Sequence, residues 1–310
     1  MAETMATRQA YGKTLIELGE KYPQLVVMDA DLSKSTMTAE FGKTYPDRFF
    51  NMGIAEQNLY GAAAGLALSG KIVCASTFAM FATGRAFEII RNSIGYTRAN
   101  VKICATHAGI TVGEDGASHQ TFEDIALMRT IPGMTVINPS DGVSAKKLLE
   151  QAVAMEGPCY VRLGRAKVPV FYEDSDQLTL GKGNLVRDGK DVTIVATGIM
   201  VSEAMAAAEK LKKDGIDARI IDIHTIKPID EEILIKAAQE TGAIVTAEEH
   251  SIIGGLGSAV AEVIVKNCPV KMAMVGQKDT YGESGKPDEL KKKYGMTAED
   301  IEAAVKTLIG

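Results

Sequence analysis

Excess positive charge, paired cysteines and long hydrophobic runs are all missing from this 310-residue chain. A formal net charge of -6 argues against non-specific nucleic-acid binding, which needs a basic surface. The longest apolar stretch, GAAAGLAL at 61–68, is too short to cross a bilayer, and the N-terminal segment has no hydrophobic signal sequence. The cysteines show no CxxC spacing, so we expect reduced thiols in a cytoplasmic protein at Cys74, Cys104, Cys159 and Cys268.

Histidine is scarce as well, yet two of the four histidines lie in one segment, THAGITVGEDGASHQ at 106–120. Between His107 and His119 stand Glu114, Asp115 and several glycines, with no lysine or arginine. A metal site would need its ligands spaced on a regular element, and a solvated acidic turn does not explain two imidazoles. We therefore expect this loop to contact a polar ligand that carries hydroxyl groups.

The order of apolar runs predicts the fold class. Short β-branched runs alternate with amphipathic patterns such as TRQAYGKTLIELGEKY and EQNLYGAAAGLALSG. Near-continuous apolar strands separated by helices indicate parallel sheets covered on both faces. Strands are expected at 24–30, 48–53, 71–77, 101–107, 134–139, 159–164, 191–198, 218–223, 243–250 and 270–276.

The length is typical of two domains, each with a core of its own. The alternation stops at 170–191, where acidic residues and glycines show no helical period. We therefore predict an α/β protein of two domains, each a mainly parallel sheet flanked by helices. The expected bounds are 1–172 for the first domain, 173–190 for a linker and 191–310 for the second domain.

Polar and aromatic residues follow several strands of the first domain, at the sheet edge where ligands of such folds bind. Glu56, in NMGIAEQNL, begins a helix rich in small apolar residues. It is either a first-turn acid that faces the helix dipole or a desolvated carboxyl that exchanges a proton with a ligand nitrogen. Phe78 and Phe81, in STFAMFATGRAF, either pack in the core or form a flat platform for an aromatic ligand.

Two glycine-rich segments resemble nucleotide-binding motifs but depart from them. YGESGKPDE at 281–289 is preceded by Thr280 where a phosphate loop has glycine, and Pro287 stands where serine or threonine is needed. GGLGSAV at 254–260 lacks the third glycine of a dinucleotide fingerprint. We expect close packing of a helix on a strand at the second segment and no nucleotide site at either.

These motifs together resemble the transketolase family of thiamine-diphosphate enzymes. THAGITVGEDGASHQTFEDIA looks like the substrate loop of transketolases, and DADLSKS, GIAEQN and ASTF occur in the expected order. The resemblance covers the pyrimidine-binding and C-terminal domains of a full-length transketolase. The diphosphate-binding domain is not represented, because the chain contains no GDG…N motif. The resemblance thus implies the C-terminal subunit of a split transketolase, which moves a two-carbon ketol unit between sugar phosphates in the pentose phosphate pathway.

The resemblance also assigns roles around the cofactor, thiamine diphosphate. Glu56 matches the glutamate that protonates the aminopyrimidine ring, and Phe78 and Phe81 match the aromatic wall around that ring. Gly84 stands where transketolases often have a further aromatic, so the wall would be thinner here. The residues expected to line the cofactor cleft are Asp31, Leu32 and Ile54.

Substrate roles follow from the same match. Asp115 and His119 match the pair that reads the hydroxyls of the donor sugar. A second group matches residues that hold the sugar phosphate, a task that suits the planar fork of arginine. This group is Arg8, Ser35, His107 and Arg165. His107 and His119 are also expected to act in catalysis beside Glu56.

The implied partner is an N-terminal transketolase subunit that carries the diphosphate-binding domain and the ligands for Mg²⁺ or another divalent metal. No metal ligand is expected in this chain. A heterotetramer is expected, and the chain is also expected to form a homodimer by itself. Two alternatives within the superfamily are a deoxyxylulose-phosphate synthase and the β-subunit of a 2-oxo acid dehydrogenase. A third is a non-catalytic regulator, which would be expected to have lost Glu56 or Asp115.

Overall fold

The computed structural model describes residues 3–310, and its N-terminal half is built on a sheet of seven strands. The strand order is β12-β6-β7-β5-β4-β2-β3, and every neighbouring pair is parallel except β12 with β6. The strands are β2 (Leu25–Asp29), β3 (Phe49–Asn51), β4 (Ile72–Phe78), β5 (Val101–Thr106), β6 (Thr135–Ile137), β7 (Cys159–Arg162) and β12 (Thr225–Lys227).

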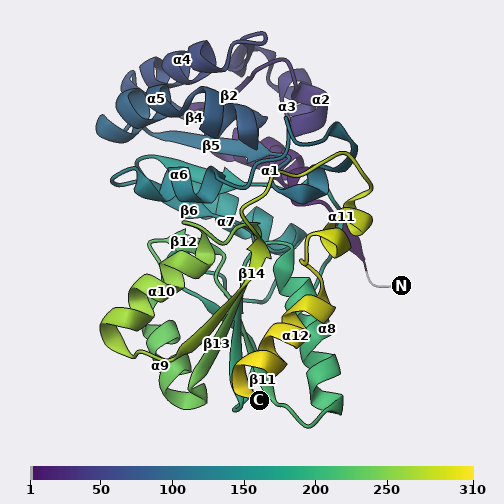
Figure 1. Cartoon of the computed structure of the whole chain (residues 1–310). Coiled ribbons are helices and arrows are strands. Elements are labelled where there is room, and N and C mark those ends of the chain that lie inside the picture. The colour runs from purple at the N-terminus through teal and green to yellow at the C-terminus, as the bar shows by residue number, and fades with distance from the viewer. Residues whose placement is uncertain (1–2) are drawn as a thin grey trace.

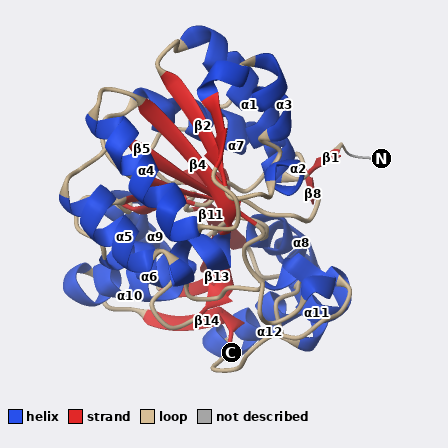
Figure 2. Cartoon of the chain, turned by 90° about the horizontal axis from the view of Figure 1, so that it is seen from above, coloured by secondary structure: helices blue, strands red, loops and turns tan. Residues whose placement is uncertain are grey.

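Helices cover both faces of this sheet, because its central strands are apolar on both sides. Figure 2 shows α1 (Thr7–Lys21) and α7 (Gly142–Ala154) on one side of the strands and α4 (Glu56–Leu68) and α5 (Phe87–Ile89) on the other. The remaining helical segments are α2 (Ser33–Thr36), α3 (Ala39–Thr44), α6 (Asp124–Thr130), the 3₁₀ turns η1 (Pro46–Arg48) and η4 (Ile110–Asp115), and the π-helical turns η2 (Phe81–Arg85) and η3 (Ile90–Tyr96).

The C-terminal half has a five-stranded sheet in the order β14-β13-β10-β11-β9, in which only β9 runs antiparallel to its neighbour. Its strands are β9 (Asn184–Arg187), β10 (Val192–Ala196), β11 (Ala218–Asp222), β13 (Ala243–Ser251) and β14 (Lys271–Gln277). Its helices are α8 (Met200–Lys213), α9 (Glu231–Thr241), α10 (Leu256–Asn267), α11 (Pro287–Lys293) and α12 (Ala298–Ile309).

The two halves are stacked and joined rather than loosely linked (Figure 1). Strand β12 comes from the C-terminal half of the chain but pairs with β6 in the first sheet. One continuous apolar cluster runs from the first sheet and α4 through α6 to α9 and α10 of the second. A short ribbon of β1 (Thr4–Met5) and β8 (Val168–Pro169) ties the N-terminal segment to the end of the first half.

The predicted fold class is confirmed, because both sheets are mainly parallel and flanked by helices. Every strand expected from the apolar runs is present within two residues of its expected ends. Strands β1, β8, β9 and β12 were not expected. Of these, β9 falls inside the segment 173–190 that was predicted as a linker.

The cysteines are free, as expected: Cys74, Cys104 and Cys159 are buried, and Cys268 is partly exposed. Between residues 3 and 310, no helix is both long and apolar enough to span a membrane.

Candidate functional site

The parallel register of the first sheet brings the predicted site residues to one edge. Asp29 pairs with Ser76, and Phe78 pairs with Thr106, so the carboxyl ends of β2, β4 and β5 lie side by side. Predicted site residues follow these three strands and the neighbouring β3. They are Asp31 and Leu32 after β2, Ile54 and Glu56 after β3, Phe81 after β4, and His107 after β5.

Glu56 is buried at the first position of α4, with 3% of its side chain exposed. Both carboxylate oxygens accept a hydrogen bond from Nη1 of Arg85, each at 2.9 Å. The Arg85 guanidinium also lies over the ring of Phe81, 4.7 Å from its centroid. A planar cation therefore rests on Phe81 and donates N–H to the buried carboxylate.

The predicted aromatic residues and both loop histidines form one cluster. The rings of Phe78 and Phe81 are stacked with centroids 5.9 Å apart, and Phe78 stacks on His107 at 3.9 Å. His119 meets Phe81 edge-on at 5.2 Å. Gly84 does not leave this wall empty, because a Cβ there would lie 2.2 Å from Cε of Met80, whose methyl group covers the position.

His107 joins this cluster to Arg8. Its Nε2 accepts a hydrogen bond from Arg8 Nη1 at 3.2 Å, so its Nδ1 carries the proton and donates to Oγ1 of Thr106 at 2.8 Å. Arg8 Nη1 also donates to the carbonyl of Ser35 at 2.7 Å, so Ser35 contributes its backbone and not its hydroxyl. Burial, followed by the charges of Arg8 and Arg165, lowers the pKa of His107 to about 3. His107 is thus a neutral group that orients Arg8.

This neutral histidine predicts a pH-dependent stability. The imidazole has a pKa of 6.5 when solvated and about 3 in the folded chain. Its contribution to the free energy of unfolding is therefore intact above pH 6.5 and is lost progressively as the pH falls towards 3. Asparagine tolerates the left-handed backbone found at His107 (φ 57°). Between pH 7 and pH 5 we expect the wild type to lose ~2 kcal/mol of unfolding free energy relative to His107→Asn, as measured by denaturant titration. A constant difference between the two proteins over this range would contradict the neutral assignment.

Arg165, the other arginine predicted to hold the sugar phosphate, reaches the 106–120 loop. Arg165 Nη1 donates to the carbonyl of Val112 and to Oε2 of Glu114, the latter at 3.1 Å. Glu114 has no basic partner within the loop and is therefore paired with an arginine from elsewhere in the chain. Asp115 is exposed. Burial and the nearby charge of Arg165 lower the pKa of Arg8. Among the residues that the structure describes, no carboxylate pairs with Arg8.

The predicted cofactor-cleft residues at the start of the chain are arranged by an aspartate that was not among the residues predicted to line the cleft. The buried carboxylate of Asp29 accepts from the backbone N–H of Leu32 at 2.6 Å and from Oγ1 of Thr36 at 2.6 Å. Asp31 has a positive φ of 63° and exchanges hydrogen bonds with Asn51. Ile54 is 78% exposed beside Glu56, which leaves an apolar side chain uncovered at the rim of the site.

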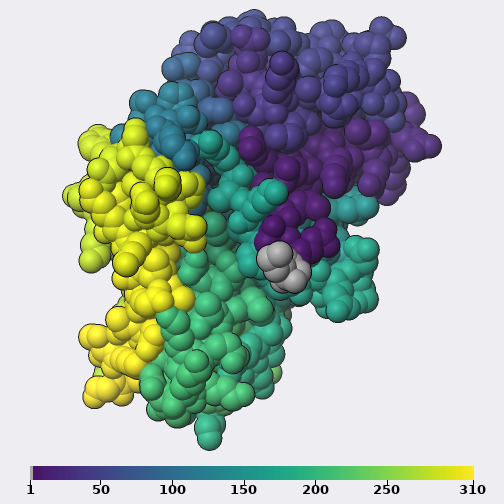
Figure 3. Space-filling view, turned by 90° about the vertical axis from the view of Figure 1, so that its right-hand side faces the viewer, coloured from purple at the N-terminus to yellow at the C-terminus, as the bar shows by residue number. Residues whose placement is uncertain are grey.

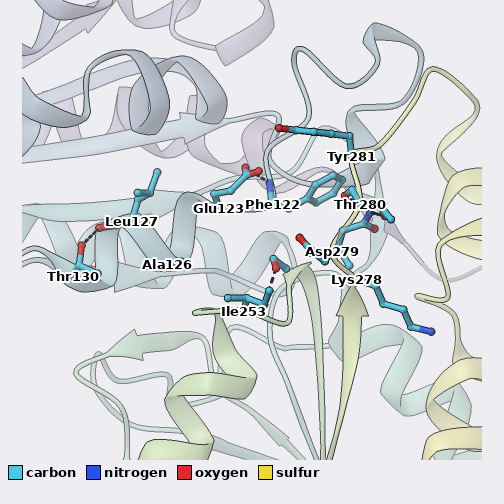
Figure 4. Close-up of a pocket in the computed structure, with 12 residues that line it drawn as sticks. Phe122, Glu123, Ala126, Leu127, Thr130, Ile253, Lys278, Asp279, Thr280 and Tyr281 are labelled. Atoms are coloured by element: carbon cyan, nitrogen blue, oxygen red, sulfur yellow. Dashed lines mark hydrogen bonds between the residues drawn. The ribbon is translucent and has the colours of Figure 1, made fainter.

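A further hollow lies apart from this site. A pocket of about 490 Å³ sits at the junction of the two halves, between residues 122–130 and residues 277–281, and contains none of the predicted site residues. Figure 4 shows Glu123 and Leu127 on the left of the view and Thr280 and Lys278 on the right, with Phe122 between them.

The site fits the aminopyrimidine half of thiamine diphosphate, because the Arg85 guanidinium already makes both contacts that such a ring needs. It stacks on an aromatic face and donates to the glutamate, as a protonated planar heterocycle would. Within residues 3–310 there is no group of three or more histidine, cysteine, aspartate or glutamate side chains that could hold a metal ion.

The fold and the site define a class of protein: a two-sheet α/β chain with a polar and aromatic ligand site at the carboxyl edge of its first sheet. Comparison with known families matches residues 3–170 to the transketolase pyrimidine binding domain and residues 181–301 to the transketolase C-terminal domain. The chain belongs to the transketolase family, and the resemblance recognised from its motifs is confirmed.

Individual relatives agree with this assignment. The "Putative transketolase C-terminal section" of Methanocaldococcus jannaschii is 57% identical, and the match covers 95% of this chain and 93% of that protein. The 6-deoxy-6-sulfo-D-fructose transketolase subunit SqwH of a Clostridium strain is 44% identical, with 95% and 91% covered. A solved structure described as "Split gene transketolase, inactive beta4 tetramer" superimposes with a TM-score of 0.91 at 54% identity and covers 98% of both chains.

Proposed function

We propose that this chain is the C-terminal subunit of a split transketolase, which transfers a two-carbon ketol unit between sugar phosphates of the pentose phosphate pathway. The observation that carries the proposal is the buried Glu56 carboxylate, which faces a planar cation stacked on Phe81. Retention of Glu56 and Asp115 argues against a non-catalytic regulator. The hydrogen-bonded pair of His107 and Arg8 and the turn at 113–116, with its adjacent Glu114 and Asp115, favour a transketolase over the other thiamine enzymes considered.

Glu56 holds and moves the proton at the cofactor pyrimidine. Its burial keeps the carboxyl out of water, so that a proton shared with a ring nitrogen is not lost to solvent. Phe78 and Phe81 orient the ring by their faces, and Leu32, Asp31 and Ile54 border the cleft. When bound, thiamine diphosphate supplies the stabilised carbanion chemistry that breaking and forming the ketol carbon–carbon bond requires.

Arg85 would have to move when the pyrimidine arrives, because its guanidinium occupies the space over Phe81 and against Glu56 that the ring would fill. The Arg85 side chain is 50% exposed, so its ion pair with Glu56 is worth at most about 1 kcal/mol. We therefore expect Arg85→Ala to bind thiamine diphosphate up to about fivefold more tightly than the wild type in the complex with the partner, as measured by calorimetric titration. Weaker binding in this variant would show instead that Arg85 holds the cofactor.

Arg8 and Arg165 would bind the phosphate of the substrate. Their like charges lie close enough for Arg165 to lower the pKa of Arg8, and such a pair suits a ligand with two negative charges. His119 meets Phe81 of the aromatic wall edge-on, and with Asp115 of the same loop it would read the donor hydroxyls. Because one relative is named for a sulfonated sugar, the assay needs phosphorylated and sulfonated donors side by side.

The partner would supply what this chain lacks. We propose a separate N-terminal subunit that carries the diphosphate-binding domain and the ligands for Mg²⁺. Two uncovered apolar side chains shortly before Glu56 in the chain, Phe50 and Ile54, support a site completed by another surface. The working assembly would contain two copies of each subunit in the cytoplasm, and the chain alone would form a homodimer or a larger homo-oligomer. Ketol transfer by the mixed subunits tests this directly.

A further inference from the structure

The 106–120 loop is attached to the C-terminal half by a buried carboxylate. Glu249, near the end of β13, accepts a hydrogen bond from the backbone N–H of Thr111 at 2.7 Å, and 3% of the Glu249 residue is exposed. The loop approaches so closely that a Cβ on Gly109 would lie 2.3 Å from Cδ of Glu249. Gly109 also has a φ of 80°, so glycine is needed there both for conformation and for space.

The segment 282–287, part of the glycine-rich motif without a nucleotide site, forms a second attachment. The side-chain amide of Gln120 donates to the carbonyl of Glu283 at 2.9 Å and to that of Gly113 at 3.3 Å. A Cβ on Gly116 would lie 2.5 Å from Oγ of Ser284, and α11 packs on η4. Figure 3 shows the yellow C-terminal segments lying against blue atoms of the N-terminal half.

Glu249 is itself fixed by a buried network. Nη2 of Arg162 donates to the Glu249 carbonyl at 2.8 Å, and Nη1 of Arg162 lies 4.0 Å from Oε2 of Glu249. Nε of Arg162 donates to Oδ2 of Asp124 at 2.7 Å, and the hydroxyl of Tyr160 donates to the same oxygen at 2.6 Å. The carboxylate that holds the loop therefore has little freedom to move, since its partners are buried and paired.

We propose that Glu249 is a positioning residue, through which the C-terminal domain sets the conformation of the 106–120 loop and hence the placement of Asp115 and His119 against the donor sugar. The inference rests on the proposed function for its substrate and gives the C-terminal domain a role beyond assembly. In this role Glu249 acts through the loop and needs no contact with substrate or cofactor.

Hydrogen–deuterium exchange on the full chain tests the attachment without any substrate. Glu249→Ala leaves the buried Thr111 N–H without an acceptor, so exchange across 107–120 should rise about 10–100-fold. Glu249→Gln keeps an acceptor oxygen and should stay within about threefold of the wild type. Glu248→Ala is the matched control: Glu248 is the adjacent buried acid, but it accepts from the N–H groups of Leu256 and Gly257 at the start of α10.

Kinetics of the enzyme reconstituted with its partner test the role in positioning. Glu249→Ala should raise KM for a sugar-phosphate donor about tenfold while the Kd of thiamine diphosphate is unchanged, and Glu249→Gln should restore KM. If Glu249→Ala fails to fold, Gln120→Ala tests the second attachment by the same measurements. Unchanged loop exchange in a folded Glu249→Ala overturns the attachment, and faster exchange with an unchanged donor KM overturns the positioning role. Absence of ketol transfer in the wild type contradicts the proposed function but leaves the exchange result interpretable.

Discussion

Glu56→Gln in the reconstituted enzyme is expected to reduce ketol transfer by about 10²–10⁴-fold, the usual contribution of a positioned acid–base group. Glutamine keeps the size of the side chain and an oxygen that can accept from Arg85, so folding should be preserved. It cannot pass a proton to the pyrimidine of the cofactor. Steady-state rates with a saturating donor and a circular dichroism spectrum of the variant give the two readouts needed.

Glu248→Gln is the matched control for this substitution. Glu248 is also a buried glutamate, but it lies on β13 in the C-terminal half, where its carboxylate accepts from backbone N–H groups at the start of α10 and lies 3.5 Å from Nδ1 of His250. We expect its activity to stay close to that of the wild type. Activity of Glu56→Gln within threefold of the wild type would show that Glu56 has only a structural role.

Arg8→Ala and Arg165→Ala should each reduce kcat/KM for phosphorylated donors by about 10–100-fold, because a charged hydrogen bond is worth roughly 1.5–3 kcal/mol. Hydroxypyruvate has no phosphate and should be affected much less. The comparison of the two donors separates a phosphate role from general damage. Arg8→Ala also removes the hydrogen bond to His107, and Arg165→Ala also removes those to Val112 and Glu114, so the readout is the ratio between the two donors and not the absolute rate.

The control for the arginines is Arg91→Ala, since Arg91 is exposed on η3 and its Nη1 donates only to the side chain of neighbouring Asn92. This variant should leave both donors unaffected. Equal losses on phosphorylated and unphosphorylated donors in Arg8→Ala and Arg165→Ala would rule out phosphate binding as their function.

The sheets were predictable because their strands are buried on both faces and read as continuous apolar runs. Of the four strands that were not expected, β12 and β9 escaped for different local reasons. β12 has three residues and joins a sheet whose other strands lie in the N-terminal half, so no local pattern indicates its partner. β9 is an edge strand with an exposed Leu185, and its polar flanks are typical of a loop. Both segments become strands because they pair with segments that are distant in the sequence.

That Phe78, His107 and Glu56 lie at one sheet edge was predictable, because each stands at or after the end of a strand. Arg85 was missed because its contact with Glu56 joins positions 29 apart and depends on the π-helical turn after β4. Glu249 was missed because its contact with Thr111 spans 138 positions and two sheets. The loop lacks a cation in its own sequence, and only the fold brings Arg165 to Glu114.

The central claim is that this chain provides the pyrimidine half of a thiamine-dependent site and needs a partner for the rest. The measurement that tests it most directly is calorimetric titration of thiamine diphosphate and Mg²⁺ into the purified chain, with and without an N-terminal subunit, followed by a ketol-transfer assay on the same samples. The account predicts weak binding and no turnover for the chain alone, and tight binding with turnover for the mixture. Tight binding and ketol transfer by this polypeptide alone would contradict it.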